Sequence, residues 1–251
     1  MSGPLSGKVA VVTGASRGLG RAIAVAFAEA GADVAVAARA KAELEETAQQ
    51  AGRHGVRALA LPTDVTSYAA VERLMTQTVA ELGRLDIVVN NAGIAKVAPL
   101  AEAALEDWRA ILDVNLSGVF HGCRAAAPYL IRQKSGKVIN LASVLAAVAL
   151  PGYTMYAATK GAVIALTRTL AVEWARHNVQ VNAIAPGWFV TDMNEAAFAD
   201  PRIHERLTRD VPARRTGRLE EIGPLALYLA GPGSEFMTGQ TIFLDGGHTV
   251  A

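Results

Sequence analysis

The sequence has one cysteine, almost no net charge and no long apolar run. Cys123 has no second cysteine to pair with, and the five histidines are scattered, so neither a disulfide framework nor a metal site is predicted. A formal net charge of +1 argues against nucleic acid as the main partner. The apolar stretch at 141–150 is about half as long as a membrane-spanning helix requires.

The N-terminal residues also lack a signal that would direct the chain out of the cytoplasm. No basic region followed by an apolar stretch is present, so no signal peptide is expected. Together with the lone cysteine, this predicts a cytoplasmic protein that does not bind a membrane.

What the chain does have is a regular alternation of short apolar runs and longer amphipathic segments. The expected strands are 8–13, 33–38, 56–61, 85–90, 137–141, 180–185 and 241–244. The expected helices are 18–30, 41–52, 67–82, 102–133, 153–177 and 219–230, and Pro128 should kink or end the fourth of these. Repeated β–α units predict one α/β domain over 1–251. It would be a Rossmann-type, doubly wound parallel sheet of about seven strands with helices on both faces.

A glycine-rich turn follows the first expected strand and opens a helix. This glycine turn, residues 13–20, reads Thr-Gly-Ala-Ser-Arg-Gly-Leu-Gly. Glycines permit a tight turn, and the helix N-terminus favours a pyrophosphate. The spacing differs from the general Gly-x-Gly-x-x-Gly pattern, and a purely structural β–α turn is the alternative. The predicted cofactor contacts in the turn are Gly14, Ser16, Arg17, Gly18, Leu19 and Gly20.

The end of the second expected strand indicates which nicotinamide cofactor binds. Proteins that bind NAD usually carry Asp or Glu there, to bind the ribose 2′-hydroxyl. Here Ala38 takes that place and Arg39 follows it, with Arg17 in the glycine turn. Two guanidinium groups without a carboxylate suit a 2′-phosphate, so NADP(H) is predicted. The alternative is that both arginines are solvated surface residues.

Three residues carry candidate chemistry: Ser143 at the end of the fifth expected strand, and Tyr156 and Lys160 in the helix after it. Residues four apart on a helix share a face. A free phenol has a pKa of about 10, and a nearby ammonium is expected to lower it toward a useful range. A serine hydroxyl can donate to the same substrate oxygen. Taken alone, Tyr-x-x-x-Lys is also common on ordinary surface helices.

With the glycine turn, these residues resemble the short-chain dehydrogenase/reductase family from about residue 7 to 247. The further matching motifs are Asn90-Asn91-Ala92-Gly93, Asn115, Pro186-Gly187 and Asp245-Gly246-Gly247. The resemblance implies that Asp64 and Val65 bind the adenine. It also assigns the loop Asn91, Ala92 and Gly93, together with Pro186, Gly187, Phe189 and Thr191, to the cofactor site, the last two near the nicotinamide carboxamide.

The resemblance also implies a mechanism. Tyr156 protonates the carbonyl oxygen as hydride reaches its carbon, and Ser143 holds that oxygen. Lys160 lowers the tyrosine pKa and binds the nicotinamide ribose, and Asn115 links Lys160 to solvent through a water. The expected activity is reduction of a carbonyl to a secondary alcohol, and the reverse, as an enzyme of class EC 1.1.1.-. Most members of the family are homotetramers, which is the expectation here.

Three segments should line the substrate pocket: residues 95–97, the uncharged 144–155, and a mobile lid at 188–217. Trp188, Phe189 and Met193 are candidate substrate contacts there, with ordinary packing as the alternative. Within the family the lid resembles gluconate 5-dehydrogenases and 3-oxoacyl-carrier-protein reductases. An NAD(H)-dependent sugar or polyol dehydrogenase is therefore an alternative. A non-catalytic NADP(H)-binding regulator is another, although such proteins typically lose Tyr or Lys from the site, and both are present here.

Overall fold

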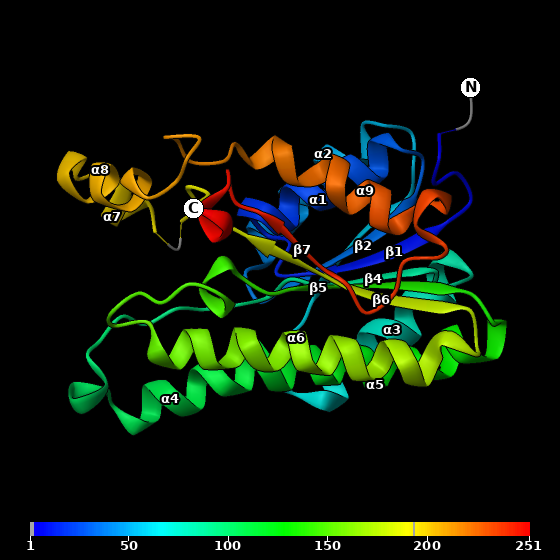
Figure 1. Ribbon diagram of the computed structural model, residues 1–251. Coiled ribbons are helices and arrows are strands. Elements are labelled where there is room, and N and C mark those ends of the chain that lie inside the picture. The colour runs from blue at the N-terminus through cyan, green and yellow to red at the C-terminus, as the bar shows by residue number, and fades with distance from the viewer. Residues whose placement is uncertain (1–2, 193) are drawn as a thin grey trace.

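A parallel sheet forms the centre of the molecule (Figure 1). The computed structural model describes residues 3–192 and 194–251, so Met193 lies outside the described residues. The strands are β1 (Val9–Thr13), β2 (Asp33–Ala38), β3 (Ala58–Pro62), β4 (Ile87–Asn90), β5 (Gly136–Leu141), β6 (Val179–Pro186) and β7 (Thr241–Leu244). The seven strands lie in the order β3-β2-β1-β4-β5-β6-β7 and every pairing is parallel. The predicted fold class is confirmed.

The strand order reverses direction between β1 and β4, and this position determines where a ligand can bind. Val12 of β1 is paired with Val36 of β2 on one side and with Val89 of β4 on the other. The connections after β1 and β4 therefore leave the sheet on opposite faces at its carboxyl edge. A crevice at such a reversal is the usual ligand site of an open α/β sheet.

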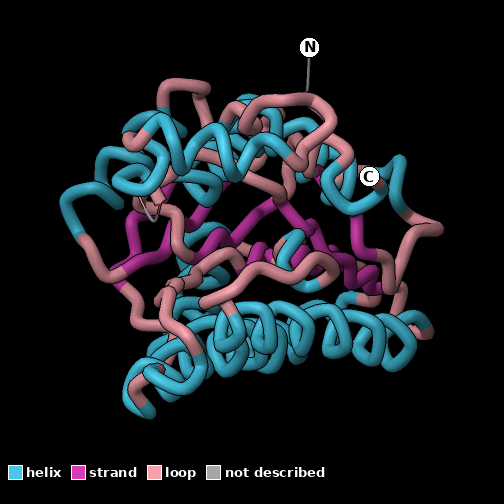
Figure 2. The backbone as a smooth tube through the Cα atoms, turned by 60° about the vertical axis from the view of Figure 1, so that its left-hand side comes forward, coloured by secondary structure: helices cyan, strands magenta, loops and turns pink. Residues whose placement is uncertain are grey.

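Helices cover both faces of the sheet, as Figure 2 shows in a second view. The helices are α1 (Gly18–Glu29), α2 (Lys41–Gly52), α3 (Tyr68–Leu82), α4 (Leu105–Leu112), α5 (Gly118–Gln133), α6 (Thr154–Ala175), α7 (Glu195–Phe198), α8 (Pro201–Arg209) and α9 (Ile222–Ala230). In Figure 1, α1, α2 and α9 lie on one face, and α3, α5 and α6 on the other. Among the described residues, no helix is both long enough and apolar enough to cross a bilayer.

The alternation of side chains along each strand builds two separate cores. In β1, Val9 and Val11 belong to the core on the α3, α5 and α6 face, whereas Ala10 and Val12 belong to the core on the other face. All five residues of the strand are buried. Strands covered on both sides must be apolar on both sides, which explains their nearly continuous apolar sequence.

The helix expected over 102–133 differs from the prediction in two ways. It starts at Leu105, and residues Asp113–Ser117 widen into a π-helical turn between α4 and α5. It does not end at Pro128, because α5 continues to Gln133. Pro128 and Arg124 are both exposed, so water can bind the Arg124 carbonyl that proline leaves without a donor.

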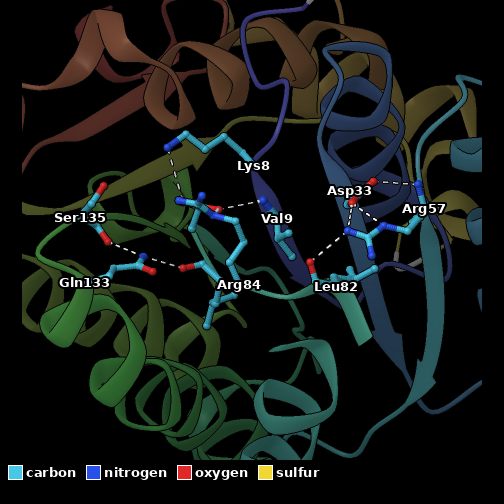
Figure 3. A network of polar contacts seen from close by, with 10 residues as sticks. Lys8, Val9, Asp33, Arg57, Leu82, Arg84, Gln133 and Ser135 are labelled. Atoms are coloured by element: carbon cyan, nitrogen blue, oxygen red, sulfur yellow. Dashed lines mark hydrogen bonds and ion pairs between the residues drawn. The ribbon is translucent and has the colours of Figure 1, made fainter. Parts of the chain in front are cut away.

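Ion pairs gather at the amino edge of the sheet (Figure 3). Asp86, just before β4, is buried; it accepts two 2.6 Å bonds from Arg84 and one of 3.0 Å from the backbone N–H of Val9. Asp33 at the start of β2 binds Arg57, which also donates to the Leu82 carbonyl at the end of α3. These contacts join strand starts to helix ends at the amino edge of the sheet. The site residues lie at the opposite, carboxyl edge.

Candidate active site

The glycine turn has a backbone that only glycine adopts easily. Gly14 and Gly18 have φ values of 63° and 55°. A side-chain carbon on Gly14 would lie 2.7 Å from the Cα of Ala92, so the β1 and β4 loops touch there. No side chain caps the N-terminus of α1 and its first turn holds no acidic residue, whereas Ser67 caps α3. The free N–H groups of α1 and this close backbone suit a pyrophosphate.

The loop after β4 is fixed to the glycine turn by side-chain hydrogen bonds. The Asn91 amide donates to the carbonyls of Thr13 and Gly14 at 2.9 and 3.0 Å. The Thr13 hydroxyl in return accepts from the backbone N–H groups of Asn91 and Ala92. The two loops that face each other across the strand reversal therefore form one rigid wall.

Two charged residues lie where the adenosine end of a dinucleotide is expected. Arg39 follows β2 and Asp64 follows β3, and both are exposed. A hydrogen bond from the backbone of Thr66, aided by the Thr66 hydroxyl and the Arg39 charge, lowers the pKa of Asp64 against the effect of its partial burial. Arg39 is thus close enough to Asp64 for its charge to be felt, while Val65 is buried beside them. Ala38 leaves the end of β2 without a carboxylate.

Ser143, Tyr156 and Lys160 come together where β5 ends and α6 begins. The Lys160 ammonium lies 5.6 Å from the centre of the Tyr156 ring and donates a 2.6 Å bond to the Leu141 carbonyl. Ser143 lies at the start of the short turn after β5, where its hydroxyl accepts from the Leu145 N–H at 3.2 Å. Lys160 and Ser143 are both buried.

Burial sets the protonation of both groups in the tyrosine–lysine pair. It raises the pKa of Tyr156 to about 12, and a hydrogen bond from Ser143 opposes this shift. It lowers the pKa of Lys160 to about 8. The net pKa of Tyr156 therefore lies above that of a free phenol, because loss of solvent disfavours the phenolate more than its surroundings stabilise it. That Lys160 lowers this pKa stays a prediction. A neutral phenol is a proton donor.

Asn115 lies in the π-helical turn and is completely buried. Its Oδ1 accepts from the N–H of Ile94 at 2.8 Å, and its Nδ2 donates to the Ile94 carbonyl at 2.9 Å and to the Thr159 hydroxyl at 3.3 Å. The Thr159 hydroxyl donates to the Tyr156 carbonyl at 2.7 Å. Asn115 thus connects the loop after β4 to the helix that bears Tyr156 and Lys160. Wide turns of this kind are common at functional sites.

A glycine leaves room between Asn115 and Lys160. A side-chain carbon on Gly93 would lie 3.5 Å from the Asn115 Oδ1 and 3.7 Å from the Lys160 Nζ. The two polar atoms therefore border the same small space. The Asn115 oxygen has accepted only one hydrogen bond, so it can take another from a water molecule there.

The lid, residues 188–217, leaves and rejoins the fold at one point. Phe189 forms a β-bridge with Gly217, whose N–H donates to the Trp188 carbonyl at 2.8 Å. The Phe189 ring is buried, and Gly217 has no side chain that would displace it. Pro186 ends β6, and Gly187 packs so closely on Asp245 that a side-chain carbon would lie 2.7 Å from its Cα. The lid base is thus fixed to the strand ends.

A row of aromatic rings runs from Tyr156 into the lid. The Tyr153 ring lies 6.4 Å from that of Tyr156 and 6.5 Å from that of Trp188, and Trp188 lies 6.0 Å from Phe198. The buried Nε1 of Trp188 has no hydrogen-bond partner within the described chain. The row gives the lid side of the site an apolar wall with one free donor.

This arrangement matches known proteins over almost its whole length. A family model described as enoyl-(acyl carrier protein) reductase matches residues 14–249. A gluconate 5-dehydrogenase of Gluconobacter oxydans is 39% identical over 247 residues, which are 98% of this chain and 96% of that protein. The chain belongs to the short-chain dehydrogenase/reductase family.

Two further members of this family show the same relationship. A 3-oxoacyl-acyl-carrier-protein reductase of Thermotoga maritima is 37% identical over 243 residues, 97% of this chain and 98% of that protein. The solved structure of a gluconate 5-dehydrogenase from Burkholderia cenocepacia J2315, in complex with NADP and tartrate, has a TM-score of 0.94 and 40% identity. It covers 98% of this chain and 97% of that one. The predicted resemblance to both kinds of enzyme is confirmed. As a member of this short-chain family, the chain is an NAD(P)-dependent oxidoreductase that acts on hydroxyl or carbonyl groups.

The sequence did not single out three residues that shape this short-chain dehydrogenase/reductase site. Thr159 links Asn115 to the backbone of Tyr156, and Tyr153 starts the aromatic row. Asn194 fixes the first turn of the lid, because it binds the Phe189 carbonyl and the Thr191 N–H. Only Asn194 had a visible signal, since Thr191-x-x-Asn194 resembles a capping box, in which the side chain three residues on accepts from the backbone N–H of the threonine.

Proposed function

We propose that this protein is an NADP(H)-dependent ketoreductase, which interconverts a ketone and a secondary alcohol. The observation that supports NADP(H) is the pair Arg17 and Arg39 beside an uncharged Ala38, with both guanidinium groups exposed at the crevice. A 2′-phosphate can form charge-assisted bonds with these groups. An NAD(H)-dependent sugar or polyol dehydrogenase is the second candidate, favoured by the similarity to gluconate 5-dehydrogenases.

The phosphate and nicotinamide ends of the cofactor would bind along the two loops at the strand reversal. In our proposal Gly14, Ser16, Gly18, Leu19 and Gly20 hold the pyrophosphate with their backbone. Asp64 and Val65 border the adenine. The segment Asn91, Ala92 and Gly93, with Pro186, Gly187, Phe189 and Thr191, borders the nicotinamide half; for the buried Phe189 only the backbone would take part.

The protein groups would position a substrate oxygen and supply its proton. The bound cofactor supplies the hydride. Ser143 would donate a hydrogen bond to the substrate oxygen, and the neutral Tyr156 hydroxyl would transfer its proton to it. Lys160 would hold the nicotinamide ribose. A water in the space beside Gly93 would accept from Lys160 and donate to the Asn115 oxygen, which connects the catalytic pair to the remaining solvent.

The pocket walls favour a substrate with an apolar or flat group next to its carbonyl. The segment 144–152 carries no charge, and the row Tyr153, Trp188 and Phe198 faces it from the lid side.

The family expectation of a homotetramer has physical support on α6. Ala158, Ala165 and Val172 recur every seven residues on its exposed side, and Val172 is 81% exposed. A straight helix presents such residues on nearly one face, where small side chains allow a second helix to approach. We propose that this stripe pairs with another copy of the chain.

The test of the proposed function is a panel of ketones, sugar acids and 3-oxoacyl thioesters, each assayed with NADPH and NADH by loss of cofactor absorbance. We expect turnover of ketones with a higher kcat/KM for NADPH. Replacing Ala38 with Asp and Arg39 with Ile should reverse or abolish the preference, because it restores a carboxylate for the 2′-hydroxyl and removes a cation. A wild-type preference for NADH would contradict the cofactor assignment.

A further inference from the structure

The start of the lid is held against the glycine turn by an ion pair. A terminal nitrogen of Arg17 lies 3.2 Å from the Oδ2 of Asp192. One residue earlier, the Thr191 methyl group lies 3.4 Å from where a side-chain carbon on Gly18 would be. Asn194 fixes the shape of this segment through its bonds to Thr191 and Phe189. Two elements far apart in the sequence thus meet directly over the proposed pyrophosphate site.

This contact uses one of the two cations that are available for a 2′-phosphate. A guanidinium that faces Asp192 is already neutralised, and a phosphate that approaches it also meets the Asp192 carboxylate. Both anions cannot share one side of Arg17 without strong repulsion. No other carboxylate of the described chain forms an ion pair with Arg17.

We infer that Asp192 competes with the cofactor 2′-phosphate for Arg17. NADP(H) must break the ion pair to bind and so releases the first turn of the lid, whereas NAD(H) leaves the pair intact. Asp192 is therefore a specificity-determining residue that lowers the preference for NADP(H). The inference rests on the proposed function for the identity of the cofactor.

The exposure of the two side chains determines how much the ion pair changes NADPH affinity. The Arg17 side chain is 62% exposed and that of Asp192 is 48% exposed, so the pair is well solvated. Exposed ion pairs typically change an equilibrium about two- to fivefold. By thermodynamic linkage, the two effects are equal in size. The factor by which the ion pair weakens NADPH binding is also the factor by which bound NADPH weakens the ion pair.

The first experiment measures cofactor affinity by fluorescence titration without substrate. Asp192→Asn keeps the size of the side chain and removes its charge, so we expect NADPH to bind about two- to fivefold more tightly and NADH affinity to stay the same. Asp210→Asn is the matched control. It removes another exposed lid carboxylate, 68% exposed against 48% for Asp192, whose ion pair in the described structure is with its neighbour Arg209, and neither affinity should change.

The second experiment follows the lid by hydrogen exchange over residues 188–200. Adenosine 2′,5′-bisphosphate carries the 2′-phosphate but no nicotinamide, and 5′-AMP lacks the 2′-phosphate. The bisphosphate should accelerate exchange in the wild-type protein, and AMP should not. In Asp192→Asn the exchange should already be fast and should not respond to the bisphosphate.

The outcomes separate this inference from the proposed function. If the wild-type protein prefers NADH, the cofactor assignment is wrong. If it prefers NADPH but Asp192→Asn changes neither NADPH affinity nor lid exchange, the competition is refuted and the assignment stands. In an Arg17→Gln background the effect of Asp192→Asn on NADPH affinity should vanish, and a persistent effect would mean that Asp192 acts by another route.

Discussion

Lys160 and Tyr156 face each other with opposite responses to burial. The ammonium lies 5.6 Å from the ring centre, yet burial lowers the lysine pKa to about 8 and raises the tyrosine pKa to about 12. The fold therefore disfavours the charged form of both groups. An anionic cofactor backbone beside Lys160 would favour its protonated form again, which couples binding to the charge of the pair.

The buried lysine should cost stability in a pH-dependent way. Its pKa is depressed in the folded state, so the unfolded chain binds more protons between about pH 8 and 10.5, and stability from this group rises with pH in that window. We expect Lys160→Met to raise the free energy of unfolding by about 1–2 kcal/mol at pH 7, after allowing for the lost bond to Leu141.

Denaturant titrations of both proteins at pH 7 and pH 10, at one protein concentration, check this. The advantage of Lys160→Met should fall by about 2 kcal/mol and so vanish or reverse at pH 10, where the folded wild-type lysine is already neutral. A difference that does not vary with pH would show that Lys160 is charged in the folded protein throughout this range.

Removing the tyrosine hydroxyl tests the chemical step alone. Tyr156→Phe preserves the ring and its contact with Tyr153 but removes the proton donor. We expect kcat to fall at least about 100-fold, while NADPH affinity by fluorescence titration stays within about twofold. Tyr153→Phe is the comparison, since it keeps the aromatic row and the Tyr156 hydroxyl. More than about a tenth of wild-type activity in Tyr156→Phe would exclude the role.

Asn115 should act by positioning rather than by chemistry. Asn115→Ala leaves the N–H and carbonyl of Ile94 without partners, which should lower stability by about 1–3 kcal/mol and also lower kcat. Asn115→Asp keeps an acceptor for the Ile94 N–H but cannot donate to its carbonyl, so its thermal stability should be intermediate. Unchanged melting temperatures in both variants would argue that these bonds do not hold the loop.

The exposed stripe on α6 should control assembly. Val172→Glu places a charge in the proposed helix pairing, and we expect the mass from light scattering to fall from that of a tetramer to that of a dimer or monomer. Gln49→Glu adds the same charge to an exposed position on α2 and should leave the mass unchanged. A wild-type monomer at micromolar concentration would refute the assembly itself.

Most of the fold could be predicted because most strands are nearly continuous apolar runs between glycine or polar boundaries. Asp33–Ala38 and Thr241–Leu244 have the predicted bounds, and the other strands differ by one or two residues at their ends. The π-helical turn could not be predicted, since Asp113–Ser117 continues the helical apolar pattern and only the added bonds of Asn115 distinguish it. Helix α5 tolerates Pro128 because that position is exposed, and the apolar periodicity of the sequence does not show which positions are exposed.

The site was predictable where motifs lie within one segment and unpredictable where segments meet. Tyr156 and Lys160 share a helix face by spacing alone. Arg17 follows β1 and Asp192 follows β6, which lie in different halves of the sheet. Nothing in the sequence indicates that these two side chains form a contact. The direction of the tyrosine pKa also depends on burial by the packing around the ring, which outweighs the hydrogen bond from Ser143.

The bridge that closes the base of the lid has a consequence for engineering. Because Phe189 and Gly217 close it with one bridge, residues 190–216 form a cassette whose two ends lie together. Insertions and loop exchanges are best tolerated where both ends are fixed and close. A different cassette could therefore be grafted at this bridge to change which ketone is accepted, while β6, the glycine turn and the tyrosine–lysine helix stay as they are. Such a graft would have to keep Thr191 and Asp192, because both lie inside the cassette and border the proposed cofactor site.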